Sequence, residues 1–85
     1  MLGRTKLRIL QITAHSPQYG YALSKKLGVS VSSIYDHLKD LEKMGLIKKE
    51  DMEDKKFYSI TANGELFLKA LKGGMSEKGN VERVI

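Results

Sequence analysis

The chain has 85 residues, of which 41% are hydrophobic and 29% are charged, and this length suits one small globular domain. It carries 15 Lys and Arg against 10 Asp and Glu, a formal net charge of +5 at pH 7. The absence of cysteine excludes disulfide bonds and thiolate metal sites. This positive charge favours a polyanionic partner such as nucleic acid, and solubility alone is the alternative explanation.

No apolar run reaches the length of a membrane span, and the basic start of the chain leads into a mixed sequence, not a signal peptide's apolar stretch. We therefore expect a cytoplasmic protein with no membrane partner. His15 and His37 have no metal-ligand spacing, and Asp36 and His37 point in different directions on a helix. We expect neither an enzyme nor a bound cofactor or metal.

The first predicted helix covers residues 3–14. Leu7, Leu10 and Ala14 recur at helical spacing and predict its buried face. The segment that follows contains Pro17 and Gly20, which are turn signals and end the helix.

Two further helices are predicted around a short turn. The second runs from about Tyr21 to Leu27, and Gly28 is the residue type at which helices commonly end. Ser30 is a good N-cap for a third helix that runs to Met44. Two helices joined by a glycine-containing turn of about three residues are typical of a helix-turn-helix.

After the third helix the pattern favours strands. Residues 46–51 and 56–60 predict two short strands joined by a charged turn, and Thr61 can cap a last helix that reaches Leu71. The predicted fold is therefore mainly α with a small antiparallel β-hairpin, a winged helix-turn-helix in the order helix, helix, helix, strand, strand, helix. We expect a domain over residues 1–72 and a tail over residues 73–85, either frayed or part of a dimer interface.

The third helix has the properties of a DNA-reading helix. At about 100° per residue, Ile34, Leu38, Leu41 and Gly45 fall in one narrow sector that must face the core. The other side and the flanks carry groups that can bond base edges in the major groove. The candidate reading residues are Ser32, Ser33, Tyr35, Asp36, His37 and Lys39.

Alternative roles remain for the same residues. Ser32 and Ser33 can serve, with Ser30, only as capping residues of a surface helix. Asp36 and Asp40 bring negative charge to the proposed DNA side and would repel phosphates.

Paired lysines are candidates for phosphate contacts, which position such a domain without reading sequence. They lie in the second helix and at the tip of the hairpin. These candidates are Lys25, Lys26, Lys55 and Lys56.

Several motifs resemble the PadR family of winged-helix repressors. They are the Gly-Tyr pair at residues 20–21, the run Ile34-Tyr35-Asp36-His37-Leu38 with Leu41-Glu42 and Gly45-Leu46-Ile47, and the strand end Tyr58-Ser59-Ile60-Thr61 followed by Gly64. The resemblance covers about residues 7–71 and implies a DNA-binding repressor with Tyr35 and the Ser32–Ser33 end of the helix at DNA. The chain departs from that family in its short Gly28-Val29 turn and in lacking the long C-terminal helices of dimerisation, and MarR- and ArsR-type regulators share part of the pattern.

The first helix carries a second apolar stripe, formed by Leu2, Ile9 and Ile12. Either the last helix and tail of the same chain cover it, or an identical helix from a second subunit does. We favour the second subunit, so the predicted function is a sequence-specific transcriptional regulator that binds a palindromic site in double-stranded DNA as a homodimer. A winged-helix protein-interaction module in a larger complex is the alternative, and the sequence indicates no effector ligand.

Overall fold

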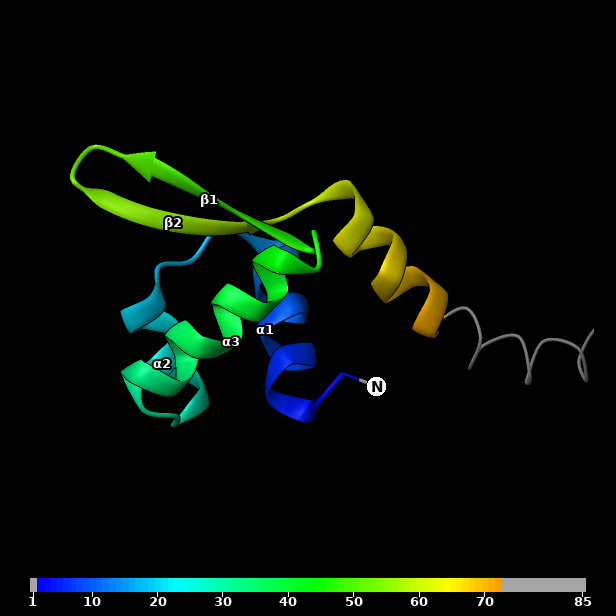
Figure 1. The fold of residues 1–85 in the computed structure, drawn as a ribbon, viewed down its shortest axis with the longest axis horizontal. Coiled ribbons are helices and arrows are strands. Elements are labelled where there is room, and N and C mark those ends of the chain that lie inside the picture. The colour runs from blue at the N-terminus through cyan, green and yellow to red at the C-terminus, as the bar shows by residue number, and fades with distance from the viewer. Residues whose placement is uncertain (1, 73–85) are drawn as a thin grey trace, which may run out of the picture.

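The structure, a computed structural model, describes residues 2–72 and confirms the predicted winged helix-turn-helix (Figure 1). The predicted tail falls outside the described residues. A further helix follows the hairpin and covers residues 62–72; we call it the 62–72 helix. The labelled elements are α1 (Arg4–His15), α2 (Gly20–Leu27), α3 (Val31–Lys43), β1 (Ile47–Met52) and β2 (Lys55–Ile60).

The turn between α2 and α3 is built as the sequence predicts. Gly28 has φ +66°, a left-handed conformation that side chains disfavour, and its N–H donates to the Ser24 carbonyl. Two residues later the Ser30 hydroxyl accepts a bond of 3.2 Å from the Ser33 N–H and caps α3. These two caps fix the angle at which α3 leaves the turn.

The core lies between the three helices and the base of the hairpin. The predicted core sector of α3 is confirmed, because Ile34, Leu38 and Leu41 are fully or almost fully buried. The complete set of buried hydrophobic residues is Ile9, Leu10, Leu23, Ile34, Leu38, Leu41, Leu46, Ile47 and Tyr58. α3 thus has one side it cannot expose, and its opposite side must face solvent.

The buried face of α1 matches the predicted one only in part, at Leu10. Ile9, Leu10 and Thr13 are buried, whereas Leu7 is only half-buried and Ala14 is exposed. Thr13 can occupy the core because its hydroxyl lies 2.9 Å from the Ile9 carbonyl oxygen and 3.1 Å from that of Leu10.

This rotation of α1 corrects part of the predicted dimer stripe. Ile9 has 0% exposure, and Ile12 packs against the core of its own chain. Ile9 therefore has no surface left for a second subunit to bury, whereas Ile12 is only half-buried and its place in a dimer interface stays a prediction. Leu2 remains available, because it is half-buried and lines a surface groove.

The hairpin is anchored to the helices at its base. In the antiparallel pairing, Ile47 lies opposite Ile60 and Met52 lies opposite Lys55, so the turn is shorter than predicted and has two residues. Gln18, in the loop before α2, pairs with Tyr58 on β2 through two backbone bonds of 2.9 and 2.7 Å. Gln18 thus forms an isolated β-bridge to the outer edge of β2, beside the two-stranded sheet.

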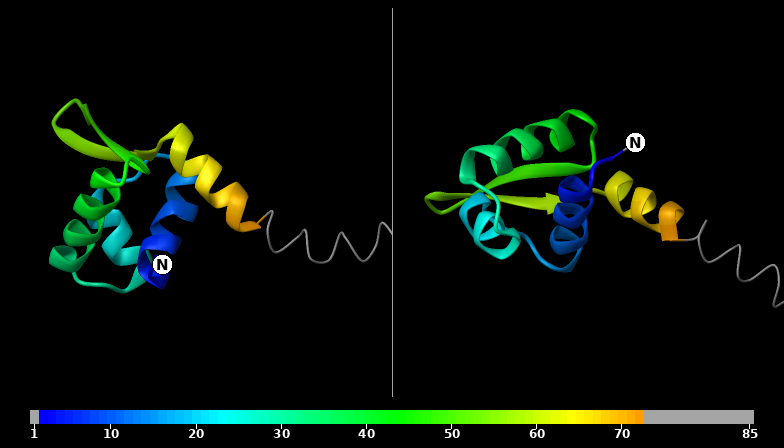
Figure 2. Two further views of the ribbon diagram at one scale, coloured as in Figure 1. Left: turned by 45° about the vertical axis from the view of Figure 1, so that its right-hand side comes forward. Right: turned by 90° about the horizontal axis from the view of Figure 1, so that it is seen from below.

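The 62–72 helix extends beside α1, at the opposite end of the molecule from the tip of the hairpin (Figures 1 and 2). Thr61 caps it as predicted, because its hydroxyl oxygen accepts a 3.0 Å bond from the Gly64 N–H. Phe67 and Leu68 pack against the core, but Leu66 is 61% exposed. This helix therefore covers part of the core and presents a second apolar side outward.

The reassigned face of α1 can be tested by stability. Ile9→Ala removes a fully buried side chain and should lower the free energy of unfolding by about 2–5 kcal/mol. Arg8→Ala, at an exposed position of the same helix, should change it by less than about 0.5 kcal/mol. Urea unfolding followed by circular dichroism measures both, and similar losses in the two variants would contradict the assignment.

Candidate nucleic-acid interface

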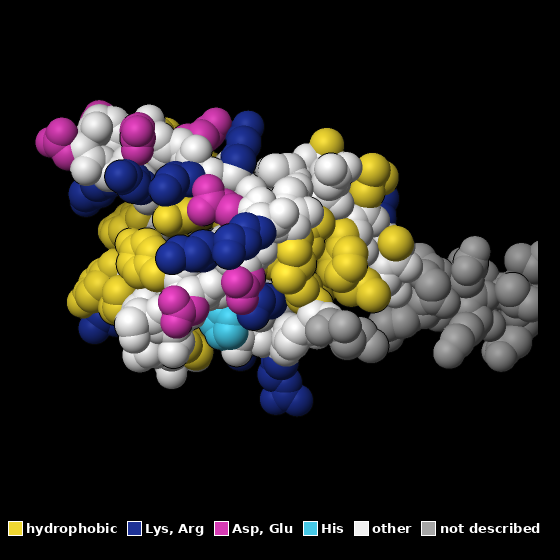
Figure 3. Space-filling view, in the orientation of Figure 1, with side chains coloured by type: hydrophobic (Ala, Val, Ile, Leu, Met, Phe, Trp, Pro, Cys, Tyr) yellow, Lys and Arg dark blue, Asp and Glu magenta, His cyan; other side chains and the backbone are white. Residues whose placement is uncertain are grey.

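The outer side of α3 presents the predicted reading residues together. Ser32, Asp36 and Lys39 are exposed, and Ser33 and His37 are half-buried. Ser32, Asp36 and Lys39 lie opposite the buried sector, and Ser33 and His37 lie on its flank, as the helical spacing requires. Figure 3 shows this side of the molecule, with charged side chains of both signs over α3.

A lysine from α1 reaches this surface and joins two residues of α3. The Lys6 ammonium lies 2.9 Å from His37 Nδ1 and 3.3 Å from a carboxylate oxygen of Asp40. An ammonium can only donate, so His37 Nδ1 is the acceptor in this contact. Lys6 also places positive charge beside Asp40, one of the two acids expected to oppose DNA binding.

Sequence reasoning missed Lys6. It is 31 residues from His37 in the chain, and only the packing of α1 across α3 brings the two together.

Tyr35 lies at the junction of α2, α3 and the hairpin. Its ring rests on the first residue of α2, Gly20, where any Cβ atom would collide with the ring. The edge of the ring meets Tyr58 of β2, with centroids 6.3 Å apart and planes at 67°. The ring remains 42% exposed, so the side chain that joins these elements is also part of the surface.

The four lysines predicted to contact phosphates, Lys25, Lys26, Lys55 and Lys56, are all exposed. Two of them lie over tyrosine rings. The Lys25 ammonium is 5.2 Å from the ring centroid of Tyr21, and the Lys55 ammonium is 5.1 Å from that of Tyr19, which packs edge-on against Phe57. Because side chains alternate along a strand, Lys55 and Lys56 lie on opposite faces of β2.

Burial raises the pKa of the Tyr58 phenol above its ordinary value of about 10, and the nearby Glu42 carboxylate and Tyr35 phenol raise it further. A folded-state pKa above the unfolded one means that the folded protein holds this proton more tightly. The stabilisation is complete below about pH 10 and is lost as the pH rises above that value.

We therefore expect the free energy of unfolding to fall as the pH rises above about 10, and to fall less in Tyr58→Phe. Urea unfolding at a series of alkaline pH values measures this dependence for both proteins. An equal pH dependence in both would show that the Tyr58 phenol does not contribute to it.

Within residues 2–72 no group of three His, Asp or Glu side chains is arranged to hold a metal ion. In the same range, none of the helices combines the length and the apolar character that a membrane crossing requires. The features that stand out in this range are therefore the surface of α3, the exposed tyrosines and the lysines around them.

Three helices, a hairpin after α3 and a further helix packed on the core define a winged helix-turn-helix protein. A model of the transcriptional regulator PadR-like family matches residues 9–70, and the chain belongs to this family. The family is one of transcriptional regulators. None of the curated protein sequences searched matches the chain.

Solved structures show the same fold at low identity. The transcriptional regulator BldR of Sulfolobus solfataricus has a TM-score of 0.80 at 21% identity, over 95% of this chain and 60% of that one. The adhesin competence repressor of Streptococcus pyogenes has a TM-score of 0.78 at 18% identity, over 96% and 63%. A homodimeric winged helix-turn-helix DNA-binding domain from Mycobacterium bovis has a TM-score of 0.75 at 20% identity, over 89% and 70%. The chain thus spans about 60% of the length of the first of these proteins.

Proposed function

We propose that this protein is a sequence-specific transcriptional regulator that binds a palindromic site in double-stranded DNA as a homodimer, with residues 1–72 as its DNA-binding domain. One observation carries the proposal. Because one sector of α3 is buried, its opposite side, with hydroxyl, carboxylate and imidazole groups, faces solvent. Exposed lysines belong to α2 and to the hairpin, both of which contact α3.

Base reading is assigned to the N-terminal half of α3. Ser32 and Ser33 can donate or accept hydrogen bonds, and Asp36 can accept from the amino group of cytosine. Lys6 beside Asp40 reduces the net negative charge of this surface. Together with His37, Tyr35 and Lys39, these groups offer the donors and acceptors that a major groove can distinguish.

Lys25, Lys26, Lys55 and Lys56 are proposed to contact phosphates. Such contacts hold the helix in register and make the affinity depend on salt.

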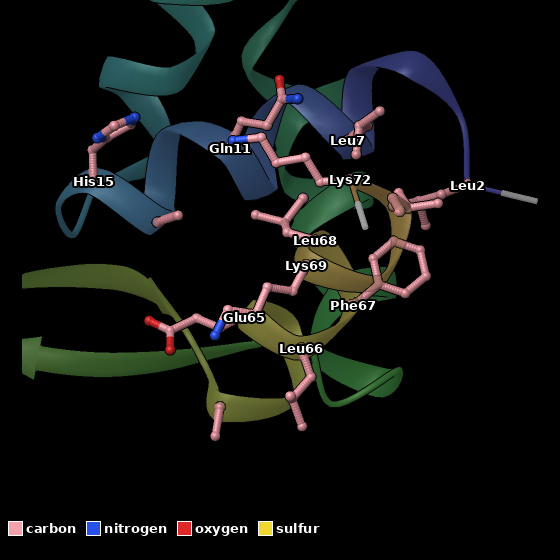
Figure 4. Close-up of a pocket in the computed structure, with 13 residues that line it drawn as sticks. Leu2, Leu7, Gln11, His15, Glu65, Leu66, Phe67, Leu68, Lys69 and Lys72 are labelled. Atoms are coloured by element: carbon pink, nitrogen blue, oxygen red, sulfur yellow. The ribbon is translucent and has the colours of Figure 1, made fainter. Parts of the chain in front are cut away.

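The site for the second subunit is proposed to be the groove between α1 and the 62–72 helix. This groove has a volume of about 880 Å³, and Leu2, Leu7, Phe67 and Leu68 are directed into it (Figure 4). It lies at the far end of the molecule from the hairpin tip, so a second copy there leaves α3 open to DNA (Figure 1). The homodimeric Mycobacterium bovis domain of the same fold supports this assembly.

The proposed role of α3 in recognising bases can be distinguished from its role in the core by comparing surface and core substitutions. First, operators are selected from a random duplex pool with the wild-type protein. Ser33→Ala or Asp36→Ala should then lose about 1–3 kcal/mol of discrimination at one or two base pairs without unfolding, because neither substitution opens a cavity. Leu38→Ala should instead destabilise the fold by about 2–5 kcal/mol.

Binding titrations on operator and single-substitution duplexes give the discrimination, and urea unfolding gives the stability. If both polar variants bind as tightly and as selectively as the wild type, α3 is not the reading helix. A wild-type protein that selects no sequence and binds no duplex at low salt would favour the protein-interaction module.

Dimer formation can be tested at Leu66, which is exposed in the single subunit and lines the groove. Leu66→Asp places a charge in the proposed interface without touching the core, so it should yield a folded monomer. Met52→Asp, at an exposed apolar residue of the hairpin, should leave a dimer. Light scattering at micromolar concentration measures both, and a monomeric wild type would contradict the proposed dimer.

A further inference from the structure

A row of polar side chains runs along the flank of α3 that meets α1. Ser33, His37 and Asp40 follow one another at spacings of four and three residues, and Asp36 lies three residues after Ser33, so these side chains adjoin on the helix surface. The Lys6 ammonium of α1 contacts two of them, at 2.9 Å from His37 Nδ1 and 3.3 Å from Asp40 Oδ2. We call Lys6, His37 and Asp40 the Lys6 cluster.

The Lys6 side chain is held in this cluster by its surroundings. It is 18% exposed, whereas the Asp40 side chain is 51% exposed. An ammonium group that has lost most of its contact with water needs polar partners, and both of the side-chain partners that the structure gives Lys6 belong to α3. The packing of α1 against α3 therefore sets where this positive charge lies.

The contact with Lys6 determines how His37 can form hydrogen bonds. An ammonium only donates, so His37 Nδ1 must accept. Both nitrogens of a protonated imidazole are donors, so an accepting Nδ1 requires the neutral ring, whose single proton is then on Nε2. His37 is half-buried, so part of its ring remains accessible.

We propose that Lys6 is a positioning residue for base recognition: it holds His37 with Nε2–H as the free donor, and α3 uses this donor to read an acceptor on a base edge. The proposal rests on the proposed function and adds a residue of α1 to the determinants of specificity. In the major groove guanine N7 and O6 and thymine O4 are acceptors, whereas cytosine N4 is a donor. His37 should therefore favour guanine or thymine over cytosine at the base that it contacts.

The acids of α3 explain why a lysine is needed at this place. Asp36 and Asp40 adjoin His37 on the helix surface, and a carboxylate can only accept hydrogen bonds. An imidazole with these neighbours alone could bond them only as a donor. Lys6 forms an ion pair with Asp40 and supplies His37 with a donor that the acids cannot provide.

The position of the proton is tested first, without DNA. Imidazole side chains are uncharged at about pH 9, and NMR of the ring nitrogens then distinguishes a proton on Nε2 from one on Nδ1. The His37 signals are identified by their loss in His37→Ala. The wild type and Lys6→Arg, which keeps a donor, should carry the proton on Nε2.

An exchange of charges should move this proton. The double variant Lys6→Glu with Asp40→Lys keeps the ion pair but places an acceptor opposite His37, so the ring should carry its proton on Nδ1. Arg8→Glu makes the same change of charge at an exposed position of α1 and should leave the proton on Nε2.

Base recognition is tested next, on operators selected from a random duplex pool with the wild type. The base pair at which His37→Ala loses discrimination is the one that His37 reads. Lys6→Met keeps the aliphatic stem but has no donor, so it should reduce the preference at the same base pair roughly 2- to 10-fold. Combined with His37→Ala it should cause no further loss, because the two residues act as one unit.

The control variants separate this role from a structural one. Lys6→Arg should retain the preference, and Arg8→Met should leave it unchanged. The charge-exchanged variant should shift the preference toward a base that offers a donor, such as cytosine. Circular dichroism confirms that each variant is folded, and a merely structural Lys6 would weaken binding to all duplexes equally.

The outcomes distinguish this proposal from the proposed function. A wild-type His37 with its proton on Nδ1, or a charge exchange that leaves it on Nε2, would overturn the role of Lys6 whatever happens on DNA. If the wild type reads its operator but His37→Ala or Lys6→Met keeps full discrimination, the role of Lys6 is wrong and the proposed function stands. If the wild type binds no duplex even at low salt, both fail.

Discussion

The burial of one side of α3 is the constraint from which the rest of the surface follows. Ile34, Leu38 and Leu41 must leave water, and α1, α2 and the base of the hairpin provide the apolar surroundings that let them do so. Burial of apolar area at about 25 cal/mol per Å² makes any rotation of α3 about its axis unfavourable. Burial of the apolar side therefore determines which side of α3 faces solvent. The polar residues on that side keep constant positions relative to each other.

The sequence was sufficient for elements whose signals are local. The Ser30 cap, the Gly28 turn and the Thr61 cap each depend on residues within a few positions, and each forms as predicted. The buried face of α1 was predicted only in part: Leu10 is buried as expected, but the prediction left out Thr13, whose hydroxyl can bond the carbonyls of the preceding turn. A pattern of apolar residues cannot register a hydrogen bond that makes a polar residue fit the core.

The surface around α3 depends on relations that are not local. Lys6 meets His37 only through the packing of α1 across α3, and Lys55 and Lys56 are separated only by strand register. A shift of one residue in that register would exchange the faces on which Lys55 and Lys56 lie, because side chains alternate along a strand. The residue types of the interface could therefore be predicted from the sequence, but their sorting onto faces required the structure.

The bridge between Gln18 and Tyr58 has a consequence for the thermodynamics of recognition. A free two-stranded hairpin is only marginally stable in water, and ordering it on contact with a partner would reduce the affinity. Here two backbone bonds and the Tyr35–Tyr58 ring contact hold the hairpin to the helices within a single chain. Most of its conformational entropy is thus lost during folding, so a partner meets a surface that is already in place and retains more of its contact energy as affinity.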